Sequence, residues 1–167
     1  MSCDVAAAAF LFLASAQPAP HQPLILVDAP AGAVAATPAP PTSVASEPLF
    51  ANIIQQAAKL KADTDGYRKR LGKASGASIA LPKFDDFQAR IAALSALDLQ
   101  GNQELAKRGT DGDLKCILRG ISQDLPKKLA DLTGAKTAPD QDTALRDMSY
   151  LLNDNVEVIT APPAPPV

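Results

Sequence analysis

Residues 114–132 read LKCILRGISQDLPKKLADL, and this stretch decides the fold class. Its Leu and Ile residues recur every three or four positions, a spacing that places them on one side of an α-helix. The apolar positions are Leu114, Ile117, Leu118, Ile121, Leu125, Leu129 and Leu132. Asp111 or Asp113 can cap the start of this helix, and Gly134 is a typical residue for its end.

Three further segments show the same helical spacing. The first follows Ser46 as its N-cap and ends at Gly72, the second runs from about Pro82 to Arg108, and the last starts at Asp140 as its cap. Their apolar stripes are Leu49, Ile53, Ala57, Leu60, Thr64, Tyr67 and Leu71 in the first, Phe84, Phe87, Ile91, Leu94 and Leu105 in the second, and Leu145, Met148, Leu151 and Leu152 in the last.

Two features affect the shape and the length of these helices. Pro126 predicts a kink, because it removes the hydrogen bond to the carbonyl of Ser122. The last helix either stops at the turn-favouring residues 153–155 or runs on to Ile159. In the second case Asn155 becomes a buried polar residue that sets helix register or reaches a ligand.

The connections between the four segments are about 5 to 11 residues long, which favours neighbours that run in opposite directions. We therefore predict an all-α fold, an antiparallel up-and-down four-helix bundle over residues 47–160.

The first 16 residues resemble a signal peptide. Residues 5–16, VAAAAFLFLASA, form an apolar run too short to span a membrane, and small residues place cleavage before Gln17. The start, Met1 to Asp4, carries no positive charge, which a start codon further upstream would explain. We expect a periplasmic or secreted protein, without a transmembrane segment in the mature chain.

Residues 17–46 are rich in Pro and Ala and predict a disordered linker, and residues 161–167 predict a disordered Pro-rich tail. The excess of Ala and Pro at both ends also points to a GC-rich bacterial genome.

The composition excludes several chemistries. The one histidine, His21, lies in the linker, and the chain has two cysteines, which argues against catalytic triads, His-ligated haem and ordinary zinc sites. The chain has 16 basic and 18 acidic residues, 4% aromatic residues and no Trp, which argues against nucleic-acid binding. We expect no cofactor.

Acidic residues offer no convincing metal or catalytic site. Residues 63–66, DTDG, lack the carboxylates that a calcium loop needs at its first and last ligand positions, and residues 111–113, DGD, fit a turn with an N-cap. Asp85 and Asp86 fit the acid-favouring start of a helix. A hydrolase that uses carboxylates alone would need two acids from different helices about 5 to 9 Å apart.

One basic cluster, made of Arg68, Lys69, Arg70 and Lys73, ends the first helix. It is a candidate contact for phosphate-bearing envelope polymers or acidic lipid headgroups, and the alternative is a solvated helix end.

The most individual part of the chain is a candidate interface made of Cys116, Arg119, Gly120, Asp124 and Pro126. Cys116 is the one cysteine expected in the exported chain, and it lies opposite the main apolar stripe of its helix. It either packs with Gly120 against another helix, forms a disulfide in a homodimer, or serves as a reactive thiol.

Together these patterns predict a small exported bacterial protein without catalytic activity, which binds another envelope protein or an envelope component. The alternative is a periplasmic carrier or chaperone that holds an apolar ligand within the bundle.

Overall fold

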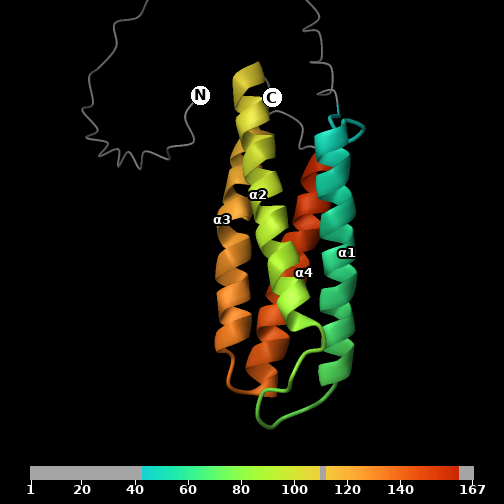
Figure 1. The fold of residues 1–167 in the computed structure, drawn as a ribbon, viewed down its shortest axis with the longest axis vertical. Helices are drawn as coiled ribbons and strands as arrows, with labels where there is room; N and C mark the ends of the chain where they lie inside the picture. Colours follow the sequence, from blue (N-terminus) through green and yellow to red (C-terminus); the bar gives the residue numbers. More distant parts are fainter. Residues whose placement is uncertain (1–42, 110–111, 162–167) are drawn as a thin grey trace, which may run out of the picture. The chain divides into compact units, whose positions relative to one another are not determined.

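The protein is described here by a computed structural model, which covers residues 43–109 and 112–161. Within these ranges it forms α1 (Pro48–Leu71), α2 (Phe84–Arg108), α3 (Gly112–Gly134) and α4 (Ala138–Thr160), packed against one another (Figure 1). The predicted all-α fold with a bundle of four helices is confirmed. The proposed signal peptide, the linker up to residue 42 and the tail from residue 162 lie outside the described residues.

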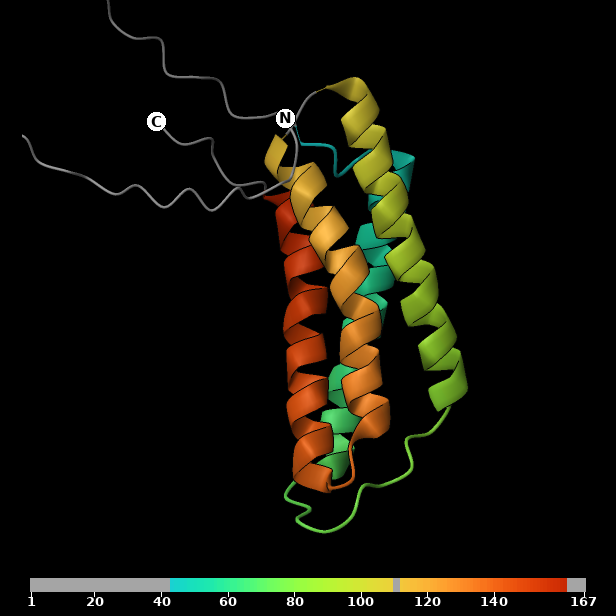
Figure 2. The same cartoon turned by 90° about the vertical axis from the view of Figure 1, so that its left-hand side faces the viewer.

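Each helix packs against two neighbours. The packed pairs are α1 with α2, α2 with α3, α3 with α4, and α4 with α1. Figure 2 shows α3 and α4 side by side. The diagonal pairs, α1 with α3 and α2 with α4, share no close backbone contact among the described residues. Residues 72–83 and 135–137 lie together at one end of the bundle, which we call the loop end.

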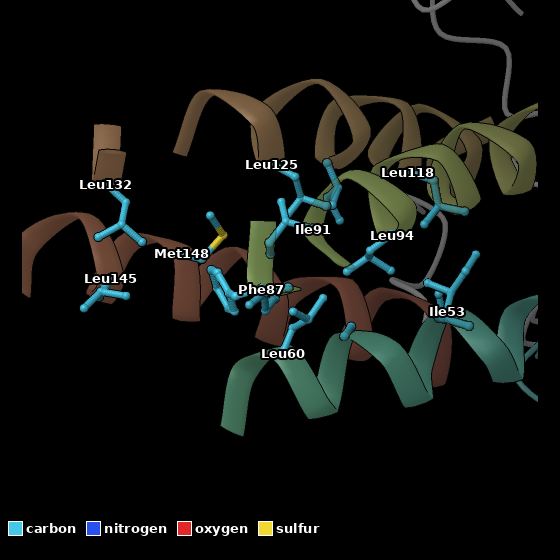
Figure 3. Packing of buried hydrophobic residues seen from close by; sticks show 14 of the residues in the cluster. Ile53, Leu60, Phe87, Ile91, Leu94, Leu118, Leu125, Leu132, Leu145 and Met148 are labelled. Atoms are coloured by element: carbon cyan, nitrogen blue, oxygen red, sulfur yellow. The ribbon is translucent and has the colours of Figure 1, made fainter. Parts of the chain in front are cut away.

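The core runs along the centre of the bundle. Figure 3 shows Ile53 of α1, Leu94 of α2 and Leu118 of α3 close to one another, and each of these side chains is 0% exposed. Nearer the loop end, Leu132 and Met148 fill the space between α3 and α4 (Figure 3). Burial of one such side chain contributes about 1.5 to 3 kcal/mol, so this shared core holds the helices together.

The start of α1 differs from the prediction by one residue. Glu47, and not Ser46, occupies the N-cap position, because Pro48 at the first helical position fixes the cap immediately before it. The Glu47 side chain does not cap the helix and instead accepts hydrogen bonds from the guanidinium of Arg108 at 2.7 and 2.8 Å. Phe50 is fully buried in the core where the prediction had placed Leu49, which is half-buried.

The start and the end of α4 also differ from the expected positions. Thr137, and not Asp140, is the N-cap, since its Oγ1 accepts a hydrogen bond from the Asp140 backbone N–H and donates one to the Asp140 carboxylate. A stop at residues 153–155 does not occur. The Asn153 amide bonds to Glu157 one turn further on, and Asn155 lies in the core, so the helix continues to Thr160.

Pro126 lies inside α3, and the helix continues through it. A proline cannot donate the hydrogen bond that would reach the Ser122 carbonyl. The hydroxyl of Ser95 in α2 donates to that carbonyl at 2.7 Å instead. The bond that Pro126 removes within α3 is therefore replaced by a bond that ties α3 to α2.

Candidate functional site

Hydrogen bonds between the two connections hold the loop end together. The backbone N–H of Ser78 donates to the Lys136 carbonyl and that of Ala138 donates to the Gly76 carbonyl, both at 3.0 Å. The buried amide of Gln141 accepts from the N–H of Ile79 at 2.8 Å and donates to its carbonyl at 2.9 Å. These bonds fix residues 76–79 against the start of α4.

Among the four cations of the predicted basic cluster, Arg68 differs from the other three because it forms an ion pair. The guanidinium of Arg68 lies 3.0 Å from the Asp142 carboxylate in α4, and this hydrogen bond raises the pKa of Arg68. Lys69, Arg70 and Lys73 are exposed and form no ion pair with any described residue. Arg68 therefore stabilises the contact between α1 and α4, whereas the other three cations are accessible.

Two further cations that sequence reasoning had not included lie at the same end. Lys83 precedes α2, and Lys136 lies in the α3–α4 connection; both are exposed and without an ion pair within the described ranges. Lys83 has a φ angle of 55°, a left-handed conformation that side-chain-bearing residues adopt at a cost. Together with Lys69, Arg70 and Lys73 they form what we call the loop-end cations.

A pocket of about 460 Å³ lies between α1 and α2 beside these cations. Arg70 and Lys83 are among its lining residues, and so are Tyr67, Asp63, Asp86, Phe87 and Arg90. Arg90 is engaged with Asp63 at 2.6 Å and with Asp86 at 3.6 Å. The Tyr67 hydroxyl donates to the Pro82 carbonyl at 2.8 Å, and burial is the main reason that the pKa of Tyr67 is raised.

The chemistry of this region favours recognition of an anion. The acids that line the pocket are bound to Arg90, whereas two cations that line it, Arg70 and Lys83, have no ion pair among the described residues. Asp63 and Asp65 lie within α1 and not in a loop, and Asp65 bonds to Lys61 and Ser149. Among the described residues no group of three or more His, Cys, Asp or Glu side chains is placed to hold a metal ion.

The candidate interface of α3 lies along one helix. Arg119 and Pro126 are exposed, and the Asp124 carboxylate pairs with Lys127 at 2.8 Å. Cys116 is half-buried and is not a free thiol. A Cβ atom at Gly120 would meet no heavy atom within 4 Å, so the expected close contact of another helix at Gly120 does not occur within the described part of the chain.

Sequence reasoning missed a polar pair at the centre of the bundle. Asp98 of α2 and Asn155 of α4 are both 0% exposed, and the Asn155 Nδ2 donates to the Asp98 Oδ2 at 2.9 Å. The remaining oxygens, Asp98 Oδ1 and Asn155 Oδ1, have no hydrogen-bond partner in the described part of the chain.

The signal for Asp98 was its spacing. Buried positions of α2 fall at Phe87, Ile91, Leu94, Asp98, Gly101 and Leu105. The spacing between these positions alternates between four and three residues, so Asp98 lies on the same face of the helix as the buried apolar residues.

Comparisons with protein-family models, with curated proteins and with solved structures find no match to this chain. None of the helices in the described ranges has the length and apolar character needed to cross a membrane.

Proposed function

We propose that the chain is a small exported protein of a bacterial envelope that has no catalytic activity, and that its bundle binds an envelope component bearing phosphate groups. The observation that supports this most is the set of loop-end cations, which are exposed and have no ion pair among the described residues. Residues 1–16 act as the signal peptide in this proposal, and residues 17–42 act as a flexible linker. The predicted linker ends before residue 46, because Val44 is buried in the core and the Ser43 hydroxyl donates to the Ile159 carbonyl.

The proposal takes the bundle to be antiparallel and up-and-down. Three residues, 135–137, separate α3 from α4. So short a connection favours an α4 that runs back along α3. The same topology brings the end of α1 and the start of α2 to the loop end, so the loop-end cations from separate segments share one surface.

The positive charge of these side chains favours binding of phosphate groups. A Lys or Arg near an anionic lipid surface contributes about 1 kcal/mol, and the contribution falls off within a Debye length of about 10 Å at 0.1 M salt. Cations that already have a carboxylate partner, such as Arg68 with Asp142, contribute less. The cations without ion pairs therefore carry the proposed interaction.

Co-sedimentation with lipid vesicles tests the proposal. We expect the full chain to bind vesicles that contain phosphatidylglycerol more tightly than vesicles of phosphatidylcholine alone. The triple variant Lys69→Gln, Arg70→Gln, Lys73→Gln should lose about 3 kcal/mol, or roughly 100-fold in affinity. Soluble polyphosphate serves as a second probe and separates binding of a phosphate polymer from binding of a lipid surface.

A matched control carries the same change of charge at the other end of the bundle. Lys107→Gln, Lys115→Gln, Arg119→Gln also removes three cations that form no ion pair among the described residues. We expect this control to bind like the unaltered chain. Equal loss in both triple variants would mean that net charge alone drives binding, and it would contradict a site at the loop end.

A further inference from the structure

Asp98 and Asn155 come from diagonal helices, α2 and α4, whose backbones share no close contact in the described part of the chain. The two side chains nevertheless reach each other, through the 2.9 Å hydrogen bond from Asn155 Nδ2 to Asp98 Oδ2. Each partner then has one oxygen left, and both of these oxygens are buried without a partner within the described ranges. Two oxygens of this kind in one pair call for a common explanation.

An ionised Asp98 does not explain them. A carboxylate has only acceptors, and so has the Asn155 Oδ1, so the two oxygens cannot bond to each other. The charge would also lie in the core with a single hydrogen bond, which is costly. Burial accordingly raises the pKa of Asp98 to about 8, although the hydrogen bond from Asn155 acts in the opposite direction.

One proton explains both oxygens. A neutral carboxylic acid has a donor and an acceptor, and a primary amide has the same two groups. With the proton on Asp98 Oδ1, this O–H donates to Asn155 Oδ1 while Asn155 Nδ2 donates to Asp98 Oδ2. We propose that Asp98 is a neutral acid joined to Asn155 by two hydrogen bonds, and that this proton holds α2 and α4 together across the bundle.

The surroundings contain no charge that would hold an ionised Asp98. The buried polar side chains on the elements packed around it are Thr64 of α1, Ser122 of α3, and Gln141 and Ser149 of α4, and none of them is charged. The other buried titratable side chain among the described residues is Tyr67 of α1, which bonds to Pro82 beside the loop end. Exchange of the proton therefore requires the bundle to open to water.

The sign of the pH effect follows from the two states. An unfolded Asp loses its proton at a pKa of about 3.9, whereas the folded bundle keeps it up to a pKa of about 8. The contribution of this group to stability is complete below about pH 4 and falls as the pH rises to about 8. Over that range the unfolding equilibrium constant rises about tenfold per pH unit through this group alone.

Asp98→Asn tests the proposal, because an amide facing Asn155 can also form two hydrogen bonds and does not titrate. Asp154→Asn removes an acid from the exposed side of α4, one residue from Asn155, and is the matched control. Unfolding of the three full chains by denaturant is measured from pH 5 to pH 9. All other titrating groups are shared by the unaltered chain and Asp98→Asn, so their effects cancel in the ratio of these two chains.

We expect the ratio of the unfolding constants of the unaltered chain and Asp98→Asn to rise about tenfold per pH unit up to about pH 8 and then to level off. Asp154→Asn should follow the unaltered chain. Parallel curves for the unaltered chain and Asp98→Asn would overturn the proposal. If Asp98→Asn does not fold, proton uptake on refolding at pH 7 decides: we expect the unaltered chain and Asp154→Asn each to take up about one proton, because both retain Asp98, and no uptake would overturn the proposal.

Discussion

Two amide side chains of α4, Gln141 and Asn155, are both buried, and they differ in what they bond to. Gln141 uses its oxygen and its nitrogen on the backbone of Ile79. Asn155 uses its nitrogen on Asp98 and leaves its oxygen without a partner among the described residues. An amide paired with backbone is satisfied at every pH, whereas an amide paired with an acid is fully satisfied only when the acid carries its proton.

The two amides also differ in their access to water. Ile79 is 38% exposed, so water can reach its backbone groups if Gln141 is removed. Asn155 and Asp98 lie in the core at 0% exposure, where no solvent can replace a lost bond. Loss of the Asn155 amide should therefore cost more than loss of the Gln141 amide.

The largest effect should come from Asn155→Leu. It leaves the buried Asp98 without its partner and should lower the free energy of unfolding by about 3 kcal/mol near neutral pH. Denaturant unfolding measures this loss. The double variant Asp98→Leu, Asn155→Leu replaces both polar groups by apolar ones and should regain most of the stability; a double variant as unstable as the single one would contradict an unpaired acid as the cause.

Gln141→Leu should have a smaller effect, about 1 to 2 kcal/mol, because water can replace the bonds to Ile79. Its loss of stability should not change between pH 5 and pH 8, in contrast to the Asp98 pair. Amide hydrogen exchange should show faster exchange at Ile79 while α2 stays protected. If the stability lost in Gln141→Leu grows with pH, this result would contradict the proposed difference between Gln141 and Asn155.

Gly101→Ala tests whether the core beside Asp98 has room for water. Its Cβ would lie 3.1 Å from Leu118 Cδ1 and 3.3 Å from both Ile53 Cδ1 and Phe50 Cε1. We expect a net loss of about 1 kcal/mol, since overpacking outweighs the gain in helix propensity. The control Gly120→Ala, which meets no neighbour, should gain about 0.5 to 1 kcal/mol. A stable Gly101→Ala would mean spare volume beside the pair.

Apolar spacing predicted the helices well because it reports burial directly. The repeat from Leu114 to Leu132 gave α3, and the end of α1 before Gly72 was also expected. The caps were less predictable. Ser46 and Asp140 are good capping residues by type, but Pro48 and the Thr137 hydroxyl decided where α1 and α4 begin.

The candidate site was less accessible to sequence reasoning, because it depends on contacts between helices. No local pattern pairs Arg68 with Asp142, which is 74 residues away, or brings Lys136 beside the α1–α2 loop. Asp98 was overlooked although its spacing placed it on the core stripe, since an acid is rarely fully buried. The sequence predicts a buried Asn155 only in the alternative in which the last helix runs on to Ile159.

The most direct test of the account is a titration of the Asp98 carboxyl carbon by ¹³C NMR in the full chain, with Asp98→Asn used to assign the signal. We predict that this carbon keeps the chemical shift of a neutral acid from pH 5 to pH 7 and changes only as the pH approaches about 8. A carboxylate shift throughout this range in the folded bundle would show that Asp98 is ionised, and it would contradict the proton-dependent pairing of Asp98 with Asn155.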